Sequence, residues 1–176
     1  MAMWRWDKTS QTCLKSPLKE EVGVMKLFGN HKSHPLAQGQ QMIACGTKGG
    51  NILIYQVSSG NLLAHIENAH YLTINDLDVS NPCGSVDADS LCGGQAHGDL
   101  IITGGKDTSV KVWKMTQLLS QKESQGTPLM SWNDHSAEVT QVRFSFAASI
   151  LRAFSSSLDK TFRVYDLPSK VCIKQI

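Results

Sequence analysis

The chain has 176 residues, a formal net charge of +2, and a composition that is 41% hydrophobic and 18% charged. This length and balance are typical of one soluble globular domain with a sizeable core, and so small a charge gives no argument by itself for nucleic-acid binding. No apolar run approaches the roughly 20 residues of a membrane span, and the first six residues do not resemble a signal peptide. The five cysteines are an odd number without close pairing, which favours a reducing compartment, the cytosol or the nucleus.

Residues 1–18 are predicted to be the end of a truncated four-stranded unit. Trp6 and Asp7 form an aromatic–acidic pair that closes one strand, and a polar turn then leads into a further strand. The hairpin that should precede Trp6 is missing, so we expect the chain to begin inside a unit.

The first complete unit is predicted to span residues 19–68, with strands at residues 22–27, 41–45, 50–55 and 62–66. Residues 58–61 have the composition of a turn. Residues 46–50 resemble a glycine-rich phosphate loop, but no helix follows them and the spacing differs, which favours a hairpin turn.

The second unit is predicted to span residues 69–132, with strands at residues 74–79, 100–103, 110–113 and 129–132. Residues 81–97 are rich in Gly, Ser and Asp and are predicted to form a surface loop. Residues 117–126 form a second polar insertion, in which a helical turn is expected.

The third unit is predicted to span residues 133–176, with strands at residues 139–144, 150–155, 161–165 and 171–176. Its last strand ends with the chain, so we expect no further unit to begin.

A hairpin within residues 100–113 shows what the units share. An apolar strand is followed by a turn of small residues containing Asp107, and a second strand then alternates apolar and polar residues up to Trp113. Two strands alone do not bury enough apolar surface to be stable, but copies of this hairpin occur at residues 156–165 and, more weakly, at residues 46–55. The closing aromatics of the three copies lie 58 and 52 residues apart. A repeat of roughly 40 to 45 residues that ends in an aromatic is typical of propeller blades, and the longer spacing here predicts inserted loops.

Two of the units also carry a His, a Ser or Thr, an Asp and an aromatic residue at matching positions. These residues are His70, Thr103, Asp107 and Trp113 in the second unit, and His135, Ser155, Asp159 and Tyr165 in the third. They resemble the structural tetrads of the WD-repeat family, in which a buried imidazole lies between a carboxylate and a hydroxyl and satisfies both. The first unit departs from this pattern and is expected to rely on packing alone, because its matching positions hold Leu18, Cys45, Gly49 and Tyr55.

The resemblance implies an all-β fold, a partial WD-repeat β-propeller. It would contain about three complete four-stranded antiparallel blades plus part of a preceding blade. The four segments 1–18, 19–68, 69–132 and 133–176 would then form one incomplete propeller domain.

A Ser, a His and an Asp brought together also fit a hydrolase triad. The trio occurs twice, once with Thr in place of Ser, and each time inside a repeat. A nucleophile needs an exposed elbow and an oxyanion hole, and the sequence has no G-x-S-x-G motif. The structural interpretation is therefore favoured.

Zinc binding by Cys83, Cys92 and His97 is a weaker alternative. The three residues lie in one predicted loop, but the spacing of the two cysteines is not typical of zinc ligands. No metal site is predicted.

The order of the motifs carries a closer resemblance. A degenerate first blade with residues 54–63 is followed by His70, the turn at residues 104–107, a long insertion, residues 132–136 and residues 155–161. This order is similar to the WD-repeat subunit of the nuclear complex that remodels precursors of the large ribosomal subunit, a pre-rRNA-processing protein. The resemblance implies a non-catalytic scaffold without cofactor, metal, small-molecule ligand or membrane.

The same resemblance implies the partners and the location. The partners would be other subunits of the remodelling complex, pre-60S particles and an AAA-type ATPase that acts on them, in the nucleolus and nucleoplasm. The alternative is a generic WD-repeat adaptor, for example the substrate receptor of a ubiquitin ligase. The loops at residues 81–97 and 117–126 are the predicted places of contact, without assigned contact residues.

Overall fold

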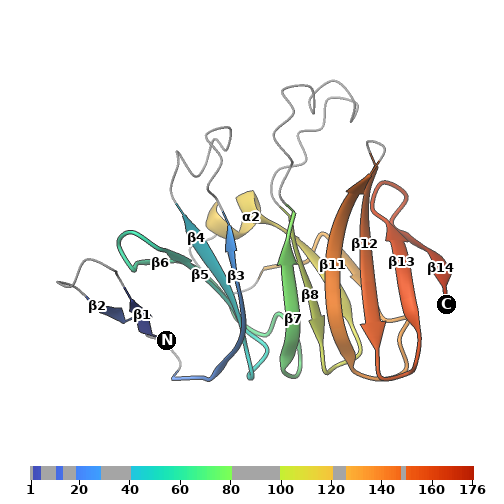
Figure 1. The fold of residues 1–176 in the computed structure, drawn as a ribbon, viewed down its shortest axis with the longest axis horizontal. Helices are drawn as coiled ribbons and strands as arrows, with labels where there is room; N and C mark the ends of the chain where they lie inside the picture. Colours follow the sequence, from blue (N-terminus) through green and yellow to red (C-terminus); the bar gives the residue numbers. More distant parts are fainter. Residues whose placement is uncertain are drawn as a thin grey trace.

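The computed structural model describes residues 2–4, 11–13, 19–28, 41–80, 100–120, 126–147 and 150–176. The predicted loop at residues 81–97, with both of its cysteines, lies outside the described residues. The described strands form three four-stranded sheets and one two-stranded sheet, all antiparallel (Figure 1). The predicted all-β architecture of three blades and part of a preceding one is therefore confirmed.

The strands follow one another in chain order within each sheet. The N-terminal pair is β1 (Ala2–Trp4) and β2 (Gln11–Cys13). The first blade contains β3 (Val22–Phe28), β4 (Met42–Thr47), β5 (Ile52–Gln56) and β6 (Leu62–Ile66). The second blade contains β7 (Ile74–Val79), β8 (Leu100–Gly105), β9 (Val110–Lys114) and β10 (Met130–Trp132). The third blade contains β11 (Val139–Ala147), β12 (Ile150–Ser157), β13 (Phe162–Asp166) and β14 (Val171–Gln175).

The blades stand side by side, and their first strands are neighbours. β3 lies beside β7, and β7 lies beside β11, so the three sheets form an arc (Figure 1). The pairing of the first two strands is irregular at the same place in each blade, between Val22 and Val24, Ile74 and Asp76, and Val139 and Gln141. A shared irregularity at one position shows that the blades are true structural repeats and not three unrelated sheets.

Apolar side chains fill the space between successive blades. Between the first and second blades, Ile52 and Ile54 pack with Ile101 and Trp113, and none of the four is more than 1% exposed. A matching core between the second and third blades contains Ile102, Val110, Val112, Val139, Ala153 and Tyr165. Burying one Ile or Val side chain stabilises the fold by roughly 1.5–3 kcal/mol, so contact between blades contributes strongly to stability.

A glycine on the second strand allows each pair of blades to approach closely. A Cβ added to Gly46 would lie 2.7 Å from Cγ2 of Ile74, and one added to Gly104 would lie 2.5 Å from Cγ1 of Val139. Side chains at these two positions would therefore push neighbouring blades apart.

Two carboxylates of β7 tie the first strands together. Asp76 accepts a hydrogen bond from the backbone N–H of Val142 (2.9 Å), and Asp78 accepts one from that of Phe144 (3.0 Å). Asp78 also forms an ion pair with Lys26 of the first blade (2.9 Å). β11 is the edge strand of the third blade, so these N–H groups have no partner strand within that blade, and the carboxylates of β7 supply the acceptors.

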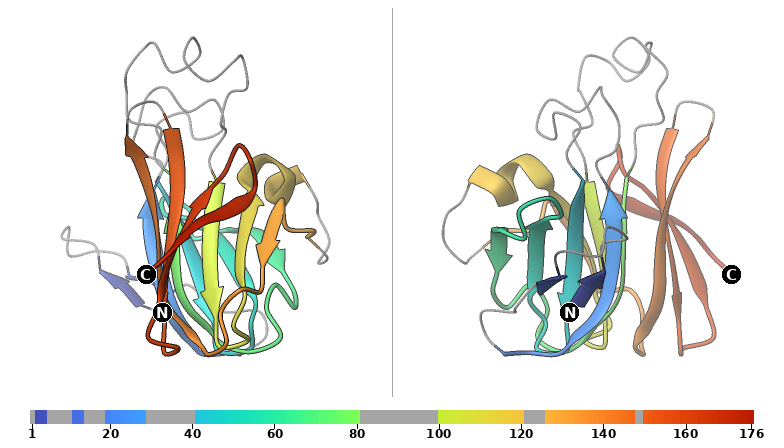
Figure 2. Two further views of the ribbon diagram at one scale, coloured as in Figure 1. Left: turned by 90° about the vertical axis from the view of Figure 1, so that its right-hand side faces the viewer. Right: turned by 60° about the vertical axis from the view of Figure 1, so that its left-hand side comes forward.

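Helix α2 (Met115–Ser120) begins two residues before the predicted insertion at 117–126, and one side of it is buried. Met115 and Leu118 are buried in the core between the first and second blades, and the helix lies against β6 (Figure 2). The described start of this insertion therefore packs between the first and second blades, and it does not form only a surface for partner proteins. No helix in the described ranges is long and apolar enough to cross a membrane.

Candidate functional site

Four residues of the second blade form one buried hydrogen-bonded network. His70 Nδ1 lies 2.9 Å from Asp107 Oδ1, and His70 Nε2 lies 2.8 Å from Thr103 Oγ1. The indole N–H of Trp113 donates to the same Thr103 oxygen (2.9 Å). The structure therefore brings together the four residues that the sequence singles out in this blade.

The donors and acceptors of this network fix the state of the imidazole. The carboxylate of Asp107 can only accept, so Nδ1 of the neutral ring carries the proton and donates it to Asp107. Nε2 then accepts from the Thr103 hydroxyl, whose oxygen accepts the indole N–H of Trp113. Burial lowers the pKa of His70 below its ordinary value, which keeps the ring neutral near pH 7.

Asp107 collects more hydrogen bonds than the tetrad alone supplies. Ser109 donates to it from its hydroxyl (2.7 Å) and its backbone N–H (3.2 Å), and the backbone N–H of Tyr71 donates at 3.0 Å. Burial alone would raise the pKa of Asp107, but the hydrogen bonds from His70, Ser109 and Tyr71 outweigh it and hold that pKa well below its ordinary range.

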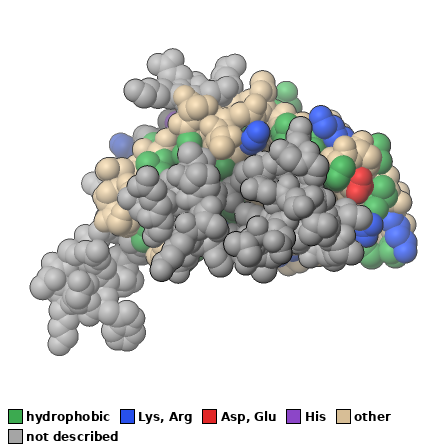
Figure 3. Space-filling view, turned by 90° about the horizontal axis from the view of Figure 1, so that it is seen from above, with side chains coloured by type: hydrophobic (Ala, Val, Ile, Leu, Met, Phe, Trp, Pro, Cys, Tyr) green, Lys and Arg blue, Asp and Glu red, His purple; other side chains and the backbone are tan. Residues whose placement is uncertain are grey.

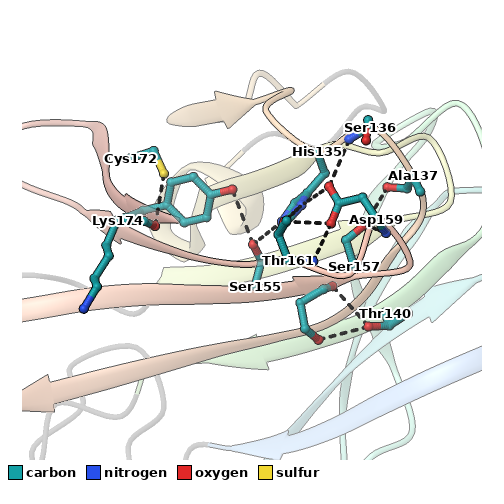
Figure 4. A network of polar contacts seen from close by, with 12 residues as sticks. His135, Ser136, Ala137, Thr140, Ser155, Ser157, Asp159, Thr161, Cys172 and Lys174 are labelled. Carbon is teal, nitrogen blue, oxygen red and sulfur yellow. Dashed lines mark hydrogen bonds and ion pairs between the residues drawn. The ribbon is translucent and has the colours of Figure 1, made fainter. Parts of the chain in front are cut away.

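The third blade repeats the arrangement with Ser and Tyr in place of Thr and Trp. His135 Nδ1 lies 2.8 Å from Asp159 Oδ2, and its Nε2 lies 2.7 Å from Ser155 Oγ (Figure 4). The Tyr165 hydroxyl lies 3.3 Å from the Ser155 oxygen, and burial raises the pKa of Tyr165 to about 12. Trp132 stacks on the Tyr165 ring with centroids 4.4 Å apart.

Sequence reasoning missed one member of each network. Thr161 donates to Asp159 from its hydroxyl (2.7 Å) and its backbone N–H (2.9 Å), as Ser109 does to Asp107. Both residues follow the aspartate by two positions, and the repeated hairpin pattern already contains a Ser or Thr there. The pKa of Asp159 is also well below its ordinary range, because hydrogen bonds from Thr161, His135 and Ser136 outweigh the effect of burial.

The expectation that the first blade relies on packing alone is wrong. Of its matching positions, Leu18 lies outside the described residues, and Cys45 is buried with a pKa raised to about 11 by burial. A different set of polar residues forms a network there: Glu20 accepts hydrogen bonds from Thr47 (2.8 Å) and from the amide of Asn51 (2.9 and 3.0 Å). The sequence comparison missed it because Glu20 stands at a position that holds no network residue in the other blades.

The geometry of the third blade argues against a hydrolase triad. The Ser155 residue is 3% exposed and the His135 side chain is 0% exposed, so no substrate can reach the hydroxyl without unpacking the blade. Within the described ranges no three His, Cys, Asp or Glu side chains are grouped as metal ligands. The alternative zinc ligands Cys83, Cys92 and His97 lie outside those ranges.

The two networks should make stability depend on pH. The pKa of buried His70 is lowered, so the unfolded chain binds its proton below about pH 6.5 while the folded chain resists it, and stability should decrease as the pH falls below that value. The pKa values of Asp107 and Asp159 are also lowered, so their contribution is present above about pH 4 and is lost below it. Urea denaturation between about pH 7.5 and 3.5 should show both losses, and in a His70→Gln variant the loss near pH 6 should be smaller.

Comparison with known proteins agrees with this geometry. Residues 60–114 and 126–166 match the model of the WD domain, G-beta repeat. The chain therefore belongs to the WD-repeat family.

Several relatives of the chain within that family are named as pre-rRNA-processing proteins. The chain is 32% identical over 165 residues to the pre-rRNA-processing protein IPI3 of Meyerozyma guilliermondii. The aligned region covers 90% of this chain and 31% of that protein. The chain is 30% identical over 134 residues to IPI3 of Candida albicans, an alignment that covers 73% of this chain and 23% of that protein. It is 29% identical over 120 residues to human WD repeat-containing protein 18, with 68% of this chain and 24% of that protein covered. The chain thus resembles WD-repeat pre-rRNA-processing proteins, and it spans less than a third of the length of these relatives.

Proposed function

We propose that this protein is a non-catalytic WD-repeat scaffold subunit that mediates protein–protein interactions in large ribosomal subunit biogenesis and pre-rRNA processing. The observation that carries the proposal is the similarity to a pre-rRNA-processing protein along 90% of the chain. The similarity extends over all three blades, so it concerns more than the turn motifs that WD-repeat proteins share.

The buried networks support a scaffold and not an enzyme. Each polar side chain of the two tetrads is paired within its own blade, and Thr103 and Ser155 are at most 3% exposed. Groups that are satisfied and inaccessible stabilise a fold but do not act on a substrate. The function then resides on the surface that the blades hold in place.

The proposed partners rest on the resemblance to the WD-repeat subunit of a pre-ribosomal remodelling complex, since the names of the relatives give only pre-rRNA processing. They are other subunits of a pre-ribosomal remodelling complex, pre-60S particles, and an AAA-type ATPase that acts on those particles. The proposed location is the nucleus, in nucleolus and nucleoplasm. We retain the segments 1–18, 19–68, 69–132 and 133–176 as the proposed repeat boundaries and the two tetrads as proposed structural sites.

Depletion of the protein tests the proposed process. We expect precursors of large-subunit ribosomal RNA to accumulate while small-subunit ribosomal RNA matures normally, because the proposed partners act only on the large-subunit particle. Pulse labelling of ribosomal RNA would measure both pathways in the same cells. Normal maturation of large-subunit RNA after complete depletion would overturn the proposal.

A further inference from the structure

In the first blade a glutamate carboxylate lies where the other blades have their network aspartate, and this glutamate comes from a different part of the chain. Position 49 matches Asp107 and Asp159, yet it holds Gly49. A Cβ added to Gly49 would lie 2.6 Å from Cδ, Oε1 and Oε2 of Glu20. The carboxylate of Glu20 therefore fills the space in which an aspartate side chain at position 49 would begin.

The partners of Glu20 match those of the two aspartates. Asn51 stands two residues after position 49, as Ser109 and Thr161 stand after their aspartates, and its amide donates to both oxygens of Glu20. Thr47 donates its hydroxyl to Glu20 and accepts the backbone N–H of Asn51 (2.9 Å). Three side chains thus hold the turn between β4 and β5 in one conformation.

This turn contacts the backbone that carries His70 of the next blade. Asn51 Oδ1 accepts the backbone N–H of Asn68 (2.7 Å), and the carbonyl of Gly50 accepts the backbone N–H of His70 (2.9 Å). The approach is close, because a Cβ added to Gly50 would lie 2.1 Å from the carbonyl oxygen of His70. The position of the backbone at residues 68–70 is therefore set by the turn that Glu20 holds.

We propose that Glu20 is a positioning residue for the network of the second blade: it fixes Asn51 and the β4–β5 turn, and through them the backbone from which His70 reaches Thr103 and Asp107. The imidazole makes both bonds at 2.8 and 2.9 Å, and such bonds weaken steeply when the geometry shifts. The substitute carboxylate of one blade thus controls the tetrad of its neighbour.

Nuclear magnetic resonance of the full chain tests this coupling. In Glu20→Ala, we expect the imidazole nitrogen signals of His70 to shift and the exchange of its amide proton to accelerate about tenfold, the size expected for the loss of one or two hydrogen bonds. The signals of His135 should stay unchanged, because its network lies two blades away from Glu20. A matched control is Glu21→Ala, which removes the adjacent, exposed carboxylate that pairs with Lys48.

Introducing an aspartate at position 49 provides a second test of the same coupling. Gly49 does not have a positive φ, so an aspartate can adopt its backbone conformation, and Glu20→Ala removes the side chain that would clash with it. We expect Glu20→Ala/Gly49→Asp to recover the His70 signals, while Gly49→Asp alone should destabilise the first blade. If Glu20→Ala fails to fold, the same spectra of Glu20→Leu, which fills the space but accepts no hydrogen bond, decide the question. Unchanged His70 signals and exchange in the folded Glu20 variant would overturn the proposal, as would equal effects of the Glu20 and Glu21 substitutions.

Discussion

Asp159→Ala should reduce the free energy of unfolding by roughly 1–3 kcal/mol, the cost of leaving buried donors unpaired. The substitution removes the acceptor for His135 Nδ1–H and for the backbone N–H groups of Ser136 and Thr161. Since the His135 side chain is completely buried, water cannot replace the lost partner without opening the blade. Urea denaturation of the purified chain measures the difference.

A matched control lies in the same blade. Asp166 also accepts hydrogen bonds at a turn, from the backbone N–H and hydroxyl of Ser169, but those bonds are exposed. Asp166→Ala should therefore cost much less than Asp159→Ala. Equal costs, or an unchanged midpoint for Asp159→Ala together with the loss of a hydrolytic activity, would contradict the structural role of the tetrad.

The purified chain should self-associate or bind a hydrophobic dye, because no other described blade covers one face of the third blade. Ala153 and Tyr165 point toward the second blade, so Phe154, Val164 and Phe162 point to the opposite face. Val164 is only 8% exposed there, so Phe162 is the main exposed apolar side chain of this face. At the position of Phe162 the other blades have Ile52 and Val110, which are 0% exposed beneath the next blade, whereas Phe162 is 39% exposed. Hydrophobic and basic side chains lie together at this end of the molecule (Figure 3).

Substitution on that face tests the cause of the association. Phe162→Lys should weaken self-association and dye binding, because a charge on an apolar sheet face opposes its burial. Leu158 is a control, because it is 63% exposed but lies in the turn between β12 and β13, so Leu158→Lys should have little effect. A compact monomer in sedimentation that binds no dye would contradict this prediction.

The sequence predicts the blades well because their hairpins follow local rules. The turn containing Asp107 or Asp159, the alternation of the next strand and its closing aromatic all lie within about one dozen residues, and they recur. The tetrad histidines follow the same kind of rule, since each lies four residues before the first residue of its blade's first strand, Ile74 or Val139. In the structure His70 and His135 reach their aspartates across 37 and 24 residues.

Features that depend on neighbouring blades could not be predicted in this way. Met25 and Leu27 are apolar residues of the predicted strand at 22–27, yet they are 58% and 53% exposed, because no described blade covers their side of β3. The role of Glu20 could not be predicted from the repeat pattern, because its carboxylate occupies the space that Gly49 leaves open by having no side chain. The burial of Leu118 likewise depends on contact between α2 and a different blade.

Affinity capture tests the central claim, that this chain acts as a scaffold in large-subunit biogenesis. The protein would be tagged in its natural cells, captured under mild salt, and its companions identified by mass spectrometry. The account predicts recovery of large-subunit precursor proteins, further subunits of a remodelling complex and an AAA-type ATPase. Recovery of cullin-type ubiquitin-ligase subunits without pre-ribosomal proteins would contradict it.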